Sequence, residues 1–460
     1  MTYKTADMDM LHGPLMKKLL LFTLPIALSS ILQQLFNAAD TAVVGRFSSA
    51  DALAAVGTNT EIIALIVTVS SGLSIGANVL TAGRIGRGRA AELPAIVQTA
   101  VLLSLLVGIF GLLLGQRAAA PLLRLIQTRE DIFRDAEQYL RLYLLGYPFL
   151  LLYDFGSAVL RARGDSRFPF LALTLSGIVN VGLNLFFVVV FRMGVAGVAI
   201  ATDLSTLLSA LLVLRRLKKD ELFRLSLRRP RLSLPCTAEL LKTSVPAAVQ
   251  GAVFCFANLF VQASVNRFGE TAIAGSTIAM NFEYLTYYII TAFGQTATTF
   301  TSQNHAAGQE ARCSRVLRLC LVLSTVCSSV PILTIVWFRS FFSGLFTPEQ
   351  AVIESAGVRI LCILPFEPLC SLHEIPAGVL RGRGHSLYPA VSTMLGTCAF
   401  RISTTAQPPL GGAKATTSQS RYVERSGSRN FGWQFAKSSV VKQPPRALIW
   451  ATSSSATRPR

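Results

Sequence analysis

The sequence alternates between long apolar stretches and short polar connections rich in Arg and Lys. A helix needs about 20 apolar residues to cross the hydrocarbon core of a bilayer, and the complete stretches reach that length. We therefore predict a helical chain that crosses a membrane many times. The predicted spans are 14–44, 52–83, 95–115, 136–162, 168–191, 194–217, 237–265, 272–303, 316–338, 356–382 and an incomplete run from residue 388.

The second half of the chain repeats the first. The motif R-x-R-G-x-S-x-x-P occurs at residues 161–169 and again at 381–389, 220 residues later. Pro148 and Pro368 are related by the same offset, and both motif copies lie between apolar stretches. A self-similar pair of hydrophobic halves is typical of secondary transporters, in which the two halves enclose a central cleft that opens to either side.

The composition agrees with lipid as the solvent, because 52% of the residues are hydrophobic and only 15% are charged. Soluble domains carry about 25% charged residues. The net charge of +19 does not indicate nucleic-acid binding, since the basic residues fall at the start of the chain and in every even-numbered connection. This is the positive-inside distribution, and it predicts a cytoplasmic N-terminus.

We divide the chain into four parts: a six-span bundle at 1–217, a basic cytoplasmic linker at 218–235, a second and incomplete bundle at 236–400, and a tail at 401–460. The expected fold is all-α and polytopic, with two pseudo-symmetric six-helix bundles, the second truncated to about 4.5 helices.

The tail has ten basic residues against one acid and no apolar span, where the repeat requires the rest of an eleventh span and a twelfth. Our hypothesis is that the reading frame was lost near Arg401. The alternative is a disordered basic tail on a protein with eleven spans.

The motifs of soluble enzymes are missing. The sequence has no G-x-x-x-x-G-K-[ST] loop, so ATP does not drive the protein directly. Its four His lack metal-ligand spacing, and its eight Cys contain no C-x-x-C pair. We expect neither an enzyme, nor a cofactor, nor a disulfide framework.

The polar residues inside the spans are the functional candidates, because an ionisable group in a membrane helix is costly. Asp40 lies in the first span, and Gln33 and Asn37 are placed to share its helix face. Burial disfavours the charged form of a carboxylate, which favours exchange of a proton. The alternative is an Asp in a water-filled cavity without a coupling role.

Asn180 and Asn184 lie one turn apart in the fifth span, and Thr202 and Asp203 lie in the sixth. Amide, hydroxyl and carboxylate oxygens from three helices could bind Na⁺, at Asp40, Asn180 and Asn184, or hold a protonated Asp40. The alternative is that these polar residues only join the helices.

Further polar residues are candidates for a substrate cavity. Asp154 and Glu374 occupy the same repeat position, which suggests paired carboxylates across the cleft, and aromatic residues in the spans would favour lipophilic cations or serve only in packing. The candidates are Gln33, Gln34, Asn37, Asp154, Asn258, Glu283 and Glu374.

Residues 37–45 (NAADTAVVG), residues 53–57 (LAAVG) and the two R-x-R-G-x-S-x-x-P copies resemble the multidrug and toxic compound extrusion (MATE) family. The resemblance covers about residues 10–400. It implies alternating access of two six-helix bundles and export of cationic amphipathic compounds in exchange for H⁺ or Na⁺.

The resemblance also implies a coupling site in the first bundle at Asp40, Asn180, Asn184 and Thr202. The chain departs from the family pattern at Asn184, where an acid is common. The span-seven carboxylate of other subgroups is also absent, and residues 254–256 read Phe-Cys-Phe there.

We expect the partners to be the lipid bilayer and small organic cations, with no nucleic acid, and a monomer in a bacterial-type inner or plasma membrane. Two alternatives remain open. One is a flippase for lipid-linked precursors, which typically needs a strongly basic cavity. The other is an inactive remnant whose second bundle cannot close.

Overall fold

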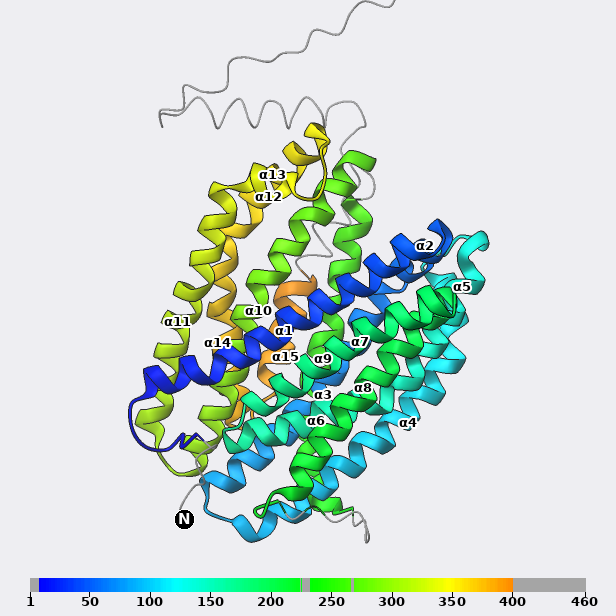
Figure 1. Cartoon of the computed structure of the whole chain (residues 1–460). Helices are drawn as coiled ribbons and strands as arrows, with labels where there is room; N and C mark the ends of the chain where they lie inside the picture. Colours follow the sequence, from blue (N-terminus) through cyan, green and yellow to red (C-terminus); the bar gives the residue numbers. More distant parts are fainter. Residues whose placement is uncertain (1–7, 224, 226–231, 266–268, 400–460) are drawn as a thin grey trace, which may run out of the picture. The chain divides into compact units, whose positions relative to one another are not determined.

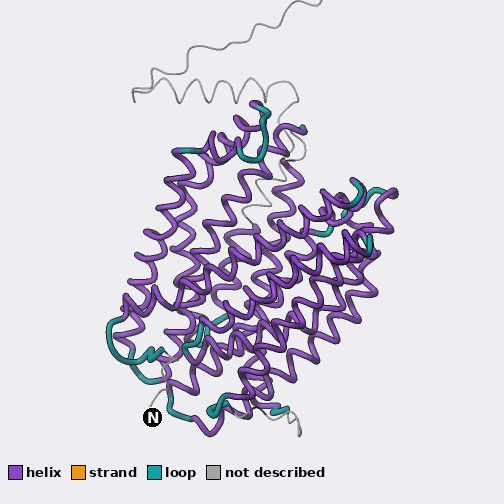
Figure 2. The backbone as a smooth tube through the Cα atoms, viewed as in Figure 1, coloured by secondary structure: helices purple, strands orange, loops and turns teal. Residues whose placement is uncertain are grey.

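The described part of the chain is built from helices. The computed structural model describes residues 8–223, 225, 232–265 and 269–399, and within these ranges there is no strand (Figure 2). Nine helical segments in these ranges are long and apolar enough to cross a membrane. The chain is therefore a multi-pass membrane protein. The predicted tail at 401–460 and part of the predicted linker at 218–235 lie outside the described residues.

The first half follows the predicted spans closely, with short one-turn segments between some of the helices (Figure 1). Its elements are α1 (Leu15–Phe47), α2 (Ala50–Thr58), α3 (Thr60–Gly86), η1 (Ala90–Glu92), α4 (Leu93–Leu125), α5 (Glu130–Tyr143), η2 (Leu144–Gly146), α6 (Tyr147–Arg163), α7 (Arg167–Leu185), η3 (Phe186–Val190) and α8 (Gly194–Lys219).

The second half repeats the order of the spans as far as the described residues extend, with one continuous helix, α10, at the position of α2 and α3. Its elements are α9 (Leu234–Val265), α10 (Glu270–Ala306), α11 (Glu310–Trp337), α12 (Arg339–Gly344), α13 (Gln350–Ile363), η5 (Leu364–Cys370), α14 (Ser371–Gly382), α15 (Leu387–Thr393) and η6 (Met394–Ala399). The predicted all-α fold with two similar halves is confirmed within the described residues.

Three predicted spans are present as membrane-spanning segments but are interrupted within their length. The span at 52–83 divides at Asn59, whose buried amide donates to the carbonyls of Ala55 and Ala136. The spans at 136–162 and 356–382 each divide around a 3₁₀ segment, and Pro148 and Pro368 lie at these breaks. Proline lacks the N–H that continues a helix.

The predicted span at 272–303 forms a helix, α10, but it is too polar to count among the nine apolar segments. Its last turns carry buried polar side chains such as Thr299, Ser302, Gln303 and Asn304. These groups form hydrogen bonds with neighbouring helices. The last turns of α10 are therefore surrounded by protein and need not be apolar.

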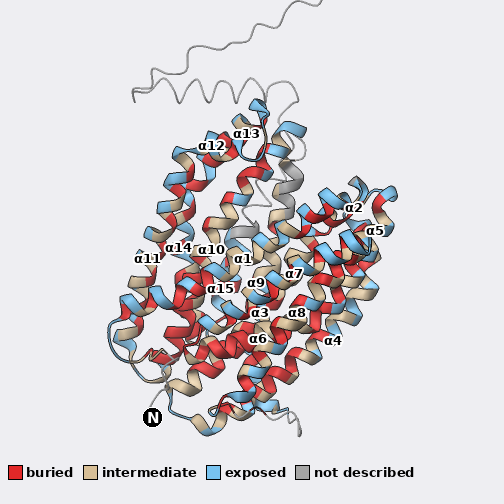
Figure 3. Cartoon of the chain, viewed as in Figure 1, coloured by how far each residue is buried: buried red, intermediate tan, exposed pale blue. Residues whose placement is uncertain are grey.

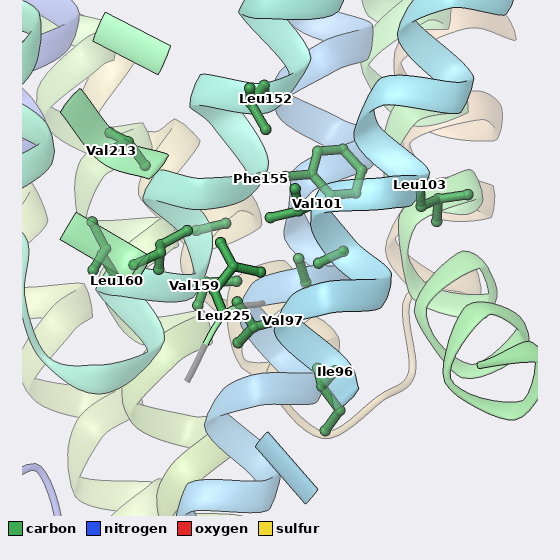
Figure 4. Close-up of a cluster of buried hydrophobic side chains, with 14 of the residues drawn as sticks. Ile96, Val97, Val101, Leu103, Leu152, Phe155, Val159, Leu160, Val213 and Leu225 are labelled. Atoms are coloured by element: carbon green, nitrogen blue, oxygen red, sulfur yellow. The ribbon is translucent and has the colours of Figure 1, made fainter. Parts of the chain in front are cut away.

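The largest apolar core of the first half lies among α4, α6 and α8. Val97 and Val101 of α4 pack with Phe155 and Val159 of α6 and with Val213 of α8 (Figure 4). Figure 3 shows buried residues concentrated where α3, α4 and α6 lie together. This packing gives α8 and α6 a rigid support, and α8 carries one side of the candidate site.

The two halves meet along a surface that we call the seam, where α3 contacts α9 and α10, and α1 contacts α10. Glycines bring α3 and α9 together, because a Cβ atom added at Gly72 would lie 2.6 Å from the Ala248 Cα, and one added at Gly76 would lie 2.3 Å from the Leu240 carbonyl oxygen. Such a close backbone approach requires glycine.

Hydrogen bonds join the halves beside these glycines. The Ser302 hydroxyl donates to the Val79 carbonyl at 2.8 Å, and the Thr299 hydroxyl donates to the Asn78 side chain at 3.0 Å. The Gln303 amide donates at 2.6 Å to the carbonyl of Ala162, which lies within the first copy of the repeated motif. The seam is therefore closed at the end that carries the basic connections.

Candidate ion-coupling site

Asp40 lies near the end of α1 and is buried, with 6% of its surface exposed. Both oxygens of its carboxylate accept hydrogen bonds. The Asn184 amide of α7 donates to Oδ1, and the Thr202 hydroxyl of α8 lies 3.2 Å from Oδ2. The structure therefore brings together polar residues from the three helices that the sequence singled out.

A second layer of contacts holds these partners. The Asn184 amide also lies 3.2 Å from the Asn180 Oδ1, one turn earlier on α7. The Asn180 amide lies 3.5 Å from the Thr202 hydroxyl, and that hydroxyl lies 3.0 Å from the Val198 carbonyl. Asp40, Asn180, Asn184 and Thr202 thus form one cluster, which we call the Asp40 cluster.

The Asp40 cluster has unused oxygen capacity. The Asn184 Oδ1 is buried and has no hydrogen-bond partner among the described residues. A buried acceptor left unsatisfied costs about 1–3 kcal/mol. A proton on Asp40, a water or a small hard cation would each relieve this cost, because amide, hydroxyl and carboxylate oxygens are the ligands of such ions.

Asp40 forms no ion pair within the described part of the chain. The described residues also contain no group of three or more His, Cys, Asp or Glu that could hold a metal ion. A buried carboxylate without a counter-charge is unfavourable by several kcal/mol, or about 3–5 kcal/mol when a partner is removed. The cluster is therefore suited to take up one positive charge.

A small pocket adjoins the Asp40 cluster. Tyr143, Gly146, Tyr147, Thr202 and Asp203 line a cavity of about 10 Å³, which is the size of a single water site. The Gly146 N–H donates to the Asp203 carboxylate. The sequence placed Thr202 and Asp203 in one span but did not predict the contact with Gly146, because that contact depends on the break between α5 and α6. Thr202 belongs both to this pocket and to the Asp40 cluster.

Gln33 and Asn37 are not part of the Asp40 cluster, although their spacing predicted a shared face. Asn37 is exposed, and its carbonyl accepts a hydrogen bond from Thr41 within α1. Gln34 instead faces the second half, where its side chain accepts a hydrogen bond from the Tyr288 hydroxyl at 3.3 Å. Helix α1 turns its polar side chains to two different neighbours, α7 and α10.

The predicted acids of the second half are paired within that half. Glu283 accepts two hydrogen bonds from Arg359, at 2.7 and 3.0 Å. Glu374 pairs with Arg381 of the same helix at 3.2 Å.

Two other predicted residues have different surroundings. The Asp154 Oδ2 is buried and has no hydrogen-bond partner among the described residues. Asn258 lies on α9 and is half-buried. A further buried acid, Glu367 of η5, accepts a hydrogen bond from the Thr286 hydroxyl of α10. The position of Glu367 in an apolar span had indicated that its carboxylate needs a polar partner.

Comparison with known proteins gives one family. The family model described as MatE matches residues 25–186 and 246–406, once in each half. The probable multidrug resistance protein YpnP of Bacillus subtilis (strain 168) is 28% identical over 86% of this chain and 89% of its own length. The probable multidrug resistance protein YoeA of the same organism is 26% identical over 81% of this chain and 82% of its own length.

The fold also matches solved structures. One is described as the outward-facing conformation of a multidrug resistance MATE family transporter of the MOP superfamily. It superposes with a TM-score of 0.82 over 88% of this chain and 90% of that one, at 21% sequence identity. The match shows that the two chains share a fold.

Proposed function

Because the chain belongs to the MatE family of transporters, we propose that it is a secondary active efflux carrier for cationic amphipathic compounds, driven by exchange for H⁺ or Na⁺. It is a transporter and not an enzyme. Relatives named as multidrug resistance proteins support the choice of substrate class.

The Asp40 cluster is the observation that carries the proposal. A single buried carboxylate, held by Asn184 and Thr202 without a counter-charge in the described residues, takes up one proton or one Na⁺. Neutralisation changes which hydrogen bonds its partners make. Because these partners belong to α7 and α8, the change acts on the packing of α1 against both helices.

The seam supports transport by alternating access. Helices α3, α9 and α10 are joined by close glycine contacts and buried hydrogen bonds at the end next to the basic connections. We place this end in the cytoplasm by the positive-inside rule and the protein in a bacterial-type inner or plasma membrane. Rocking of the halves would break these contacts and form others at the opposite end.

Expression in a drug-sensitive host tests the proposal. We expect the protein to lower ethidium accumulation and Asp40→Asn to restore accumulation to the level of cells without the transporter. Asp51→Asn is the matched control, since Asp51 is an exposed acid at the start of α2. Full activity of Asp40→Asn would exclude the coupling role, provided both variants reach the membrane in equal amount.

The same assay separates the alternatives. Unchanged ethidium accumulation with normal membrane insertion would favour an inactive remnant, and a version with the reading frame restored before residue 401 would test whether the tail alone is responsible. A flippase for lipid-linked precursors would leave ethidium unchanged in both versions. The buried acids and amides of the described spans do not favour that alternative, because a pyrophosphate group needs basic partners.

A further inference from the structure

A short segment before α1 lies across the closed end of the seam. We call residues 8–13 the N-terminal strap, and it leads into the start of α1, which lies beside α11 (Figure 1). Within the strap, the Asp9 carboxylate accepts hydrogen bonds from the backbone N–H groups of Leu11 at 2.9 Å and His12 at 3.3 Å. The Lys18 ammonium donates to the carbonyls of Asp9 and His12, both at 2.6 Å. The strap is therefore folded against the first turn of α1.

The second half holds the N-terminal strap through Arg312 of α11. The Arg312 guanidinium donates to three strap carbonyls, those of Met10 at 3.2 Å, His12 at 3.1 Å and Gly13 at 3.1 Å. The buried Asn304 amide of α10 also donates to the Met10 carbonyl, at 3.2 Å. A guanidinium carries five N–H donors in a fixed fork, so this one side chain can fix a stretch of backbone.

The Met10 side chain adds an apolar contact to these hydrogen bonds. It is 1% exposed and belongs to the apolar core that α1 shares with α10, α11 and α14. Removal of this side chain from the core would expose apolar surface to water, which is unfavourable. The N-terminal strap is thus attached to the second half by both its backbone and a side chain.

The first half contacts the other end of the N-terminal strap. Gly164 lies in the first copy of the repeated motif and has a φ of 107°. A Cβ atom added there would lie 2.6 Å from the Met8 carbonyl oxygen and 2.9 Å from the Met8 nitrogen. Gly384 is the equivalent residue of the second copy, with a φ of 86°, and nothing lies within 4 Å of its added Cβ. The close approach at Gly164 is therefore a feature of the strap and not of the repeat.

We propose that the N-terminal strap is a latch that holds the two halves together at the closed end of the seam. Opening of this end would move Gly164 away from Asn304 and Arg312, so the strap must leave one side or the other. The hydrogen bonds and the buried Met10 side chain that are lost in this step favour the closed state. The effect of the latch on export rests on the proposed function, whereas its effect on separation of the halves does not.

The latch is tested by releasing the strap from either side in the purified full-length protein. Arg312→Gln removes the guanidinium, and Gly164→Ala places a methyl group against the Met8 backbone. All proteins carry Ser302→Cys as the reporter, because Ser302 is 2% exposed and contacts Val79 across the seam. We expect Arg312→Gln to accelerate alkylation of this thiol by N-ethylmaleimide about 5- to 30-fold, the factor for loss of one or two net hydrogen bonds. Gly164→Ala should change the rate in the same direction.

The chain offers a matched control for each variant. Arg315 is an exposed arginine of the same helix as Arg312, and Arg315→Gln should leave the rate unchanged. Gly384→Ala introduces alanine at a positive φ without a strap to displace, and it should also react at the reference rate. In a protein that lacks residues 2–13, Arg312→Gln should cause no further acceleration, because its effect passes through the strap.

Reference rates at the Ser302→Cys thiol in both Arg312→Gln and Gly164→Ala would overturn the latch. Fast alkylation of a Met10→Cys thiol in the same proteins would then show that the strap leaves without opening the seam. Acceleration in the controls as large as in the variants would overturn it as well. Melting temperatures identify misfolded variants, and Arg312→Lys, which keeps the charge but not the fork, then replaces Arg312→Gln. Failure of ethidium export in cells would contradict the proposed function and leave the alkylation result intact.

Discussion

At the scale of single residues, the Asp40 cluster has one carboxylate where the family pattern commonly has two, because Asn184 stands at the second position. Asn184→Asp would place two acids around the oxygens of Asn180 and Thr202. A doubly charged oxygen site binds a hard monovalent cation more tightly, and a bound ion stabilises the folded protein by mass action. We expect the melting temperature of this variant to rise with Na⁺ more steeply than that of the wild type.

The control replaces Na⁺ with choline at the same ionic strength. Choline should not raise the melting temperature of either the wild type or Asn184→Asp by binding to the Asp40 cluster. Asn184→Leu offers a second comparison, since it removes both the donor to Asp40 and the unused Oδ1. Equal Na⁺ responses in Asn184→Asp and the wild type would show that the oxygens of the Asp40 cluster do not form a cation site.

Much of the Asp40 cluster could be predicted from the sequence. Spacing placed Asn180 and Asn184 on one face of a helix, and the cost of burying polar groups selected Asp40 and Thr202 as well. Spacing also placed Asn37 on the helix face of Asp40, and Asn37 is exposed there. The surroundings of Asn37 and Asp40 differ because different helices pack against each side of α1. The periodicity of α1 alone does not contain that information.

At the scale of helices, contact between α3 and α9 depends on Gly76, where an added Cβ would meet the Leu240 carbonyl oxygen and the Ser244 hydroxyl, both at 2.3 Å. Gly76→Ala should therefore lower stability by about 1–3 kcal/mol through overpacking. Gly182→Ala in α7 is the matched control, because nothing lies within 4 Å of its added Cβ. There alanine should be neutral or stabilise the helix by up to about 1 kcal/mol.

Thermal unfolding of both variants in the same detergent measures the contrast. A melting temperature of Gly76→Ala at or above that of Gly182→Ala would show that the close backbone contact at Gly76 does not stabilise the packing of α3 against α9.

The positions at which helices break within a span were the feature that the apolar runs predicted least well. The division at Asn59 depends on its bond to Ala136, 77 residues away, and hydropathy cannot register such a contact. Pro148 and Pro368 did carry a local signal, since proline interrupts the hydrogen bonds of a helix. The breaks at these two positions recur in both halves because the repeat carries the proline with it.

At the scale of the whole transporter, an ion pair joins the two halves at the closed end of the seam. Arg84 of α3 pairs with Glu239 of α9 at 2.7 Å and with Glu92 of its own half at the same distance. Because a partly exposed pair contributes about 0.2–1 kcal/mol, Glu239→Gln should increase the population that is open at this end by about 1.5- to 5-fold. Glu92→Gln is the matched control, since it removes a pair within one half.

Cys236 of α9 reports on this opening without an added label. It is a half-buried free thiol that packs against the apolar core of the first half, and separation of the halves exposes it. Alkylation by N-ethylmaleimide, followed at Cys236 by peptide mass spectrometry, should accelerate in Glu239→Gln and stay near the wild-type rate in Glu92→Gln. Cys320 is fully buried in the apolar core that α1 shares with α10, α11 and α14, and it serves as an internal reference. Equal acceleration in both variants would mean that loss of either pair loosens α3 itself, and the two halves would then not separate at the end that carries the basic connections.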